Sequence, residues 1–152
     1  MHNTKRTPGG RKQKGAAAIE FAAVFVIFFG VFYALVSYSL PLLMMQSFNA
    51  ATSEAVRRSV ALSPAINNYS SLIVSQAQSV LSQQLDWMPA TLAQDVKQYT
   101  YVTYTAGVLR ASIAYPKENL HQILPVLSLP VVGEIPRLPT YLSAEASLQL
   151  VP

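Results

Sequence analysis

A single carboxylate stands at the entrance to a long apolar stretch, in "RKQKGAAAIEF", residues 11–21. A charged side chain deep in a bilayer costs about 2.5–3.5 kcal/mol on insertion scales, less near an end, and it usually has a partner. The apolar stretch that follows Glu20 contains no cation. Two explanations are open. Glu20 lies in the headgroup region at the start of a helix, where its charge suits the helix dipole, or it serves in assembly with another molecule.

The other reactive side chains form no catalytic or metal-binding pattern. His2 lies in the basic head of the chain, and His121 lies in a proline-rich stretch without a carboxylate close in sequence. Nothing in the sequence pairs Asp86 with Asp95 as an acid and base. The chain has no cysteine, which excludes a thiolate nucleophile, a sulfur-ligated zinc site and disulfides. We therefore expect no catalytic residue, no metal and no cofactor, and a protein that is not an enzyme.

The positive charge of the chain is concentrated before the apolar stretch. Five of the 11 Lys and Arg residues lie within the first 15 positions, which leaves six bases against seven acids in the remainder. No basic patch with interleaved aromatic residues exists elsewhere, so we expect no nucleic-acid partner. A basic flank before an uncharged span follows the positive-inside rule and predicts a cytoplasmic N-terminus.

Residues 21–45 carry no charge and are long enough to cross roughly 30 Å of hydrocarbon at about 1.5 Å per residue. A secretory signal peptide has a shorter apolar region, of about 7–15 residues, followed by a small-residue cleavage site. We therefore predict a transmembrane helix. The helical pattern continues beyond the span, with Glu54 four residues before Arg58 in the favourable order for an ion pair. One helix is expected from Ala16 to Leu62, after an unstructured head of residues 1–15.

The second half of the chain changes its hydrophobic period. Apolar residues recur every three or four positions from Tyr69 to Met88, which predicts an amphipathic helix, and residues 91–97 could add a short one. From Tyr99 the period is two, and two strands flank Ala106-Gly107 as a hairpin. Since alanine is a poor choice for a left-handed position, we expect a three-residue turn with Gly107 left-handed. Residues 116–139 hold five prolines and predict a loop with one helical turn, and residues 140–151 alternate again as a third strand.

The head of the chain resembles a class III signal, the site cut by prepilin peptidases. "KGAAAIEF" places the glutamate fifth and the phenylalanine sixth after Gly15, behind a basic leader and before an apolar helix. The small alanine run and the Glu-Phe pair are most similar to the TadE/TadG-like pseudopilins of tight-adherence (Tad/Flp, type IVb) pili. "NAATSEAVRRSVAL" also resembles the segment that those proteins carry beyond the membrane. The resemblance covers roughly residues 10–62. The sequence departs from the family pattern in one respect: the family often has a proline in the first half of the apolar stretch, whereas here the first proline of that stretch is Pro41.

The resemblance implies cleavage between Gly15 and Ala16, with Glu20 and Phe21 as assembly and recognition residues. Cleavage creates an α-amino group on Ala16 with an unperturbed pKa of about 8. In the resembling systems the fifth-position glutamate neutralises this amine on a neighbouring subunit. The implied partners are the prepilin peptidase, the major pilin, other minor pseudopilins, the inner-membrane assembly platform and the membrane itself. Because the major pilin of these systems is far shorter than this chain, a minor component is the better assignment.

The predicted fold class is α+β. A long N-terminal transmembrane helix continues into a small periplasmic domain with a second amphipathic helix and a small antiparallel β-sheet. The predicted segments are a basic leader (1–15), a pilin-like helix (16–62, span about 21–45) and a head domain (63–152). The predicted function is a minor pseudopilin in a Tad/Flp pilus used in adhesion and biofilm formation, anchored in the bacterial inner membrane with the head in the periplasm. An uncleaved single-span anchor with a partner-binding or scaffolding domain is the alternative. Tip initiation, length regulation and adhesion stay open, as does entry into the mature filament.

Overall fold

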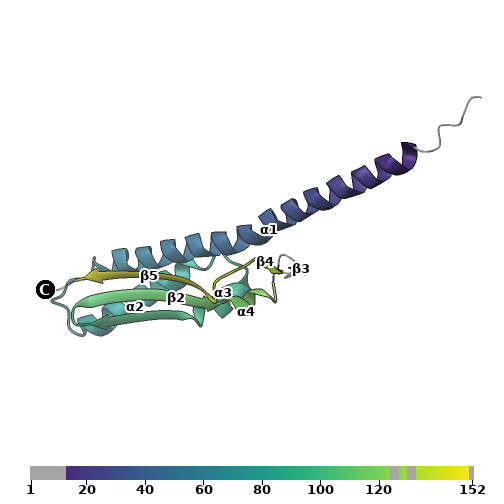
Figure 1. Cartoon of the computed structure of the whole chain (residues 1–152). Helices are drawn as coiled ribbons and strands as arrows, with labels where there is room; N and C mark the ends of the chain where they lie inside the picture. The colour runs from purple at the N-terminus through teal and green to yellow at the C-terminus, as the bar shows by residue number, and fades with distance from the viewer. Residues whose placement is uncertain (1–12, 124–126, 130–132, 151–152) are drawn as a thin grey trace, which may run out of the picture. The chain divides into compact units, whose positions relative to one another are not determined.

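The structure is a computed structural model that describes residues 13–123, 127–129 and 133–150. Its first element is the helix α1, Gln13–Ser59, which passes through Pro41 without ending (Figure 1). The predicted helix is confirmed, with its start three residues early and its end three residues early. The expectation of an unstructured head is wrong for Gln13 to Gly15, which are helical, because the alanines after Gly15 are strong helix formers and Gln and Lys extend the helix in front of them. Residues 1–12 lie outside the described part.

The chain divides into two units, one ending at Val36 and one beginning at Ser37. Within the second unit α1 buries one side of its surface. The buried side chains follow one another three or four positions apart, or as adjacent pairs, as one face of an α-helix requires. They are Ser37, Pro41, Met44, Phe48, Ala51, Thr52, Ala55, Val56 and Ser59. Two of the buried hydroxyls donate hydrogen bonds back along the helix, Thr52 Oγ1 to the Phe48 carbonyl at 2.9 Å and Ser59 Oγ to the Ala55 carbonyl at 2.7 Å.

Three shorter helices follow in the second unit. They are α2, Tyr69–Gln84; α3, Ala90–Lys97; and α4, Lys117–Leu120. The buried residues of α2 are Ile73, Ala77, Val80 and Leu81, which match the periodicity seen in the sequence. The predicted amphipathic helix is thus confirmed, as are the short helix before the hairpin and the helical turn in the proline-rich stretch.

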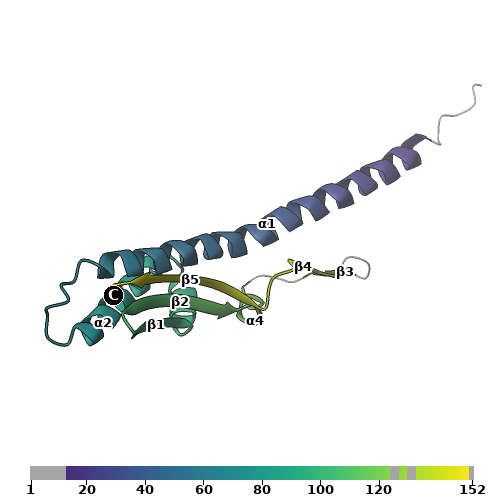
Figure 2. The same ribbon diagram turned by 60° about the vertical axis from the view of Figure 1, so that its left-hand side comes forward.

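A three-stranded antiparallel sheet has the order β1-β2-β5, and in Figure 2 β2 runs beside β5. The strands are β1, Thr100–Thr105; β2, Val108–Pro116; and β5, Tyr141–Gln149. The register pairs Thr105 with Val108 and Ile113 with Ala144. The predicted hairpin and third strand are confirmed. A two-stranded ladder of β3, Leu127–Leu129, and β4, Gly133–Ile135, was not predicted.

The turn of the hairpin differs from the prediction. Thr105 pairs directly with Val108, so only two residues form the turn, and both have positive φ: 51° at Ala106 and 75° at Gly107. Two left-handed residues in a two-residue loop give the type I′ turn, whose twist matches that of the flanking strands. The twist of the hairpin therefore outweighs the cost of placing an alanine in the left-handed region.

One face of the sheet is buried and the other is open. Alternate residues of β2 (Leu109, Ala111, Ile113 and Tyr115) join Leu142 and Ala144 of β5 in one core cluster with the buried faces of α1, α2 and α3. The opposite face carries exposed polar and aromatic residues, among them Tyr101, Arg110 and Glu145. This alternation is typical of an antiparallel sheet covered by helices on one side.

Candidate processing and assembly site

The predicted cleavage residues lie near the start of α1. Gly15 and Ala16 are both exposed, and no other atom lies within 4 Å of the position that a Cβ on Gly15 would take. The space around Gly15 is therefore open in this structure. Packing within the described chain does not require a glycine there.

Glu20 and Phe21 follow one turn later on the same helix. Glu20 is exposed, and no ion pair to it occurs among residues 13–123, 127–129 and 133–150. Phe21 is 71% exposed, and its ring stacks on that of Phe25 at a centroid distance of 6.2 Å. Phe25 in turn stacks on Phe29 at 6.2 Å. Glu20 thus stands beside an aromatic row that runs along the helix at intervals of four residues.

The helix that carries these residues is a candidate membrane span by length and composition, from Gly15 to Ser59. None of its most apolar part is buried within the chain. Large side chains such as Ile19, Val26 and Phe28 are about two-thirds exposed or more. A helix that is apolar on every side requires an apolar surrounding, in the form of lipid or other helices.

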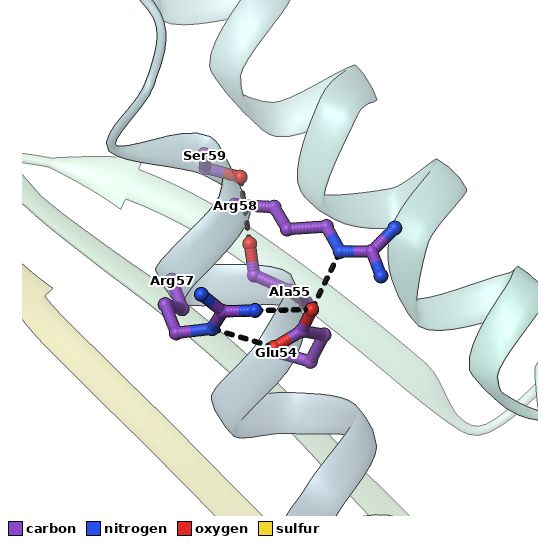
Figure 3. A network of polar contacts seen from close by, with 5 residues as sticks. All are labelled: Glu54, Ala55, Arg57, Arg58 and Ser59. Atoms are coloured by element: carbon purple, nitrogen blue, oxygen red, sulfur yellow. Dashed lines mark hydrogen bonds and ion pairs between the residues drawn. The ribbon is translucent and has the colours of Figure 1, made fainter.

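A second polar cluster lies near the C-terminal end of α1 (Figure 3). Glu54 accepts two hydrogen bonds from Arg57, from Nε and Nη2, at 2.7 Å each, and a third from Nε of Arg58 at 2.6 Å. The predicted pair between Glu54 and Arg58 is confirmed. The forked bond from Arg57 at i+3 was missed, although the spacing in the sequence permits it.

The two guanidinium groups change the acidity of Glu54. The hydrogen bond from Arg57, followed by that from Arg58, lowers the pKa of the Glu54 carboxyl to about 2. The same carboxylate raises the pKa of Arg57. Two positive charges share one negative charge, so the cluster keeps a surplus positive charge at the helix end, where a cation is favourable to the helix dipole.

The remaining acidic side chains considered in the sequence have structural partners. Asp86 accepts a bond from Lys97 Nζ at 2.6 Å. Asp95 accepts bonds on Oδ2 from the Tyr115 hydroxyl at 2.6 Å and from Asn119 Nδ2 at 3.1 Å. Within the described ranges, no three His, Cys, Asp or Glu side chains gather closely enough to hold a metal ion. The network of Asp95, Tyr115 and Asn119 was not predicted, because its members are 20 and 24 residues apart and no local pattern links them.

Residues 15–57 match the family model of TadE-like proteins. The matched residues make up less than a third of the chain and lie entirely within α1. The match confirms the resemblance inferred from the sequence for this helix and is consistent with a TadE-like component of a Tad pilus. No curated protein and no solved structure matches the chain.

Proposed function

We propose that this chain is a minor pseudopilin of a Tad-type pilus, cut after Gly15 by a prepilin peptidase and assembled through its N-terminal helix. The observation that carries the proposal is the TadE-like match over residues 15–57, which begins at the glycine of the predicted cut. The proposed role is structural, and no reaction is assigned to the protein itself. Its partners would be the peptidase, the major pilin, other minor pseudopilins and the assembly platform.

The exposed apolar helix supports an assembly role. In the membrane, lipid would surround the side chains that the chain leaves exposed, and in a filament the helices of other subunits would replace the lipid. Such an exchange brings no large hydrophobic gain, because lipid is as apolar as the partner helices, so polar contacts and close packing must direct it. Glu20 is the acidic residue available for that purpose near the start of the helix.

Cleavage after Gly15 would supply the cation that Glu20 lacks. The new amine on Ala16 would be largely protonated at neutral pH, since an α-amino group has an unperturbed pKa of about 8. In a bundle of low dielectric constant, an unpaired charge is strongly disfavoured, so pairing of Glu20 with the amine of a neighbouring subunit would fix the axial register. The basic leader, read with the positive-inside rule, supports a cytoplasmic N-terminus and a periplasmic second unit.

Sequencing the N-terminus of the protein isolated from its native host tests the cut. The mature chain is expected to begin AAAIEF. Gly15→Val should block the cut, and Gly30→Val is the matched control, because it makes the same change in the same helix and also meets no atom within 4 Å. A functional protein that retains residues 1–15 would overturn the proposal in favour of an uncleaved anchor.

Replacing Glu20 tests assembly separately from cleavage. Glu20→Ala should leave the cut intact and abolish or strongly reduce surface pili, counted by electron microscopy. Glu145→Ala, the same change at an exposed glutamate of β5 outside the residues of the family match, is the control and should keep the pili. Normal pili with Glu20→Ala would remove the role assigned to this carboxylate.

A further inference from the structure

An open cleft of about 440 Å³ lies between α3 and the segment that begins with α4. It is lined by Thr91, Leu92, Asp95, Asn119, Gln122 and Ile123. The spacing within each set, 91-92-95 and 119-122-123, places the residues on one face of a helical turn. The cleft belongs to the second unit and is remote in sequence from the proposed cleavage site. Its volume falls within the range of about 300–1,000 Å³ that ligand clefts have.

The cleft contains a carboxylate that is held in place by neutral groups. Oδ2 of Asp95 accepts a bond from the buried Tyr115 hydroxyl and another from Asn119 Nδ2, which also lies 3.3 Å from the Tyr99 hydroxyl. No hydrogen bond or ion pair to Oδ1 of Asp95 occurs in the described part of the chain. No lysine or arginine is present among the described residues that line the cleft. The carboxylate of Asp95 is therefore held in a fixed position, and no positively charged side chain pairs with it in the described part of the chain.

The other lining residues suit a long basic side chain. Ile123 is 47% exposed and offers apolar surface to an aliphatic stem, while Leu92, which is 6% exposed, belongs to the core next to the cleft. Thr91 and Gln122 carry oxygen atoms that can accept hydrogen bonds from a cationic head. Lysine and arginine bury their stems along apolar surface while their charged ends bind polar groups, which is the chemistry this cleft presents.

We propose that the cleft binds the side chain of an arginine or lysine from a partner protein, with Asp95 as the counter-ion. A metal ion is a poorer fit, because calcium takes six to eight oxygen ligands with several carboxylates, and the described lining has one carboxylate. Charge complementarity of this kind contributes mainly to specificity and to the rate of association. The inference does not depend on the proposed cleavage or on the pilus.

The first experiment uses N-acetyl-arginine amide as a probe on the full chain in detergent micelles. Saturable NMR shifts of the side-chain amides of Asn119 and Gln122 are expected. N-acetyl-citrulline amide has the same shape without the charge and should bind about tenfold more weakly or not at all. Equal binding of both probes, or no saturable shift, would overturn the proposal. A response to calcium in place of arginine would identify a metal site and would also overturn it.

Gln122→Lys provides a variant that leaves the bonds of Asp95 in place. Gln122 is exposed, so the variant should fold. Its ammonium group should form an ion pair with Asp95 and weaken the binding of the arginine probe about tenfold. Gln98→Lys is the matched control, an exposed glutamine at the end of α3 that is not part of the cleft lining, and it should bind the probe as the parent does. Unchanged binding by Gln122→Lys would contradict the assignment of the cleft.

A photo-cross-linking residue at position 123 in the native host tests for the partner itself. The cross-linked peptide is expected to contain a lysine or arginine near the linkage. The cross-link should be lost with Gln122→Lys and kept with Gln98→Lys. Absence of a cross-link, a cross-linked segment without a base, or a cross-link that persists with Gln122→Lys would overturn the proposal.

Discussion

Removing the hydroxyl of Tyr115 should measure how strongly the Asp95 network stabilises the second unit. Tyr115 is fully buried, and its hydroxyl donates to Asp95 Oδ2 at 2.6 Å. Tyr115→Phe keeps the ring and its edge-to-face contact with Tyr99, at 5.6 Å between centroids, and leaves Asp95 with Asn119 as its remaining described donor. Hydrogen bonds to charged groups contribute about 1.5–3 kcal/mol, so a loss of that size is expected in the free energy of unfolding.

Urea unfolding of the full chain in detergent, followed by the fluorescence of Trp87, provides the assay. Trp87 is the sole tryptophan, and its Nε1 donates to Ser47 Oγ at 2.8 Å, so it reports on the second unit. Tyr101→Phe is the control, because Tyr101 lies on the open face of the sheet and is 56% exposed. The control should change the stability by less than about 0.5 kcal/mol, as surface substitutions usually do.

The pH dependence distinguishes loss of this bond from a general packing defect. Burial, followed by the bond to Asp95, raises the pKa of Tyr115 above its usual value of 10.0. The folded state therefore favours the protonated hydroxyl, and its contribution is complete below pH 10 and declines as the pH rises toward the raised pKa. The parent should lose stability above pH 10 more steeply than Tyr115→Phe. Equal stability of the two proteins at pH 7, with parallel alkaline profiles, would refute the reasoning.

Three other predictions concern the fold and the helix end. Phe48→Ala, in the fully buried face of α1, should cost about 3–5 kcal/mol and lower the midpoint of urea unfolding. Glu54→Gln should make the stability of the fold depend less on pH in acid. The carboxylate of the parent stabilises the fold above its ordinary pKa of 4.5, and this contribution is lost as the pH falls through about 2. An acid titration followed by the fluorescence of Trp87 would detect the difference. Ala106→Gly should raise the midpoint of urea unfolding, because an alanine in the left-handed conformation destabilises the turn by about 1 kcal/mol and glycine does not. An unchanged or lower midpoint would argue against strain at the turn.

Local patterns in the sequence predicted most of the elements. The four-residue spacing of Ile73, Ala77 and Leu81 predicted α2, because each of them contacts the core from one side of a helix. The alternation in β2 predicted a strand for the equivalent reason. The turn was mispredicted at Ala106 because side-chain preference was weighed without the twist of the hairpin, which is a property of the paired strands.

Contacts between distant segments could not be predicted from those patterns. Asp95 and Tyr115 lie on different elements, and their bond depends on how α3 packs against the end of β2. The cleft beside Asp95 could not be predicted for the same reason, because its lining comes from two segments that are distant in the sequence. Arg57 was within reach of a local argument, since a glutamate three residues before an arginine lies on the same face of a helix.

Hydropathy also failed to separate two kinds of apolar helix surface. The charge-free stretch of residues 21–45 reads as one span, yet Ser37 and Met44 are buried in the second unit. Side chains that face lipid and side chains that face a protein core have the same composition, so a hydropathy profile cannot tell them apart. Residues 16–36 alone would measure roughly 30 Å at about 1.5 Å per residue, which is enough to cross the hydrocarbon. A span over those residues would put Glu20 about one turn from its N-terminal end, where a carboxylate is least costly and would lie next to the amine that the proposed cleavage creates.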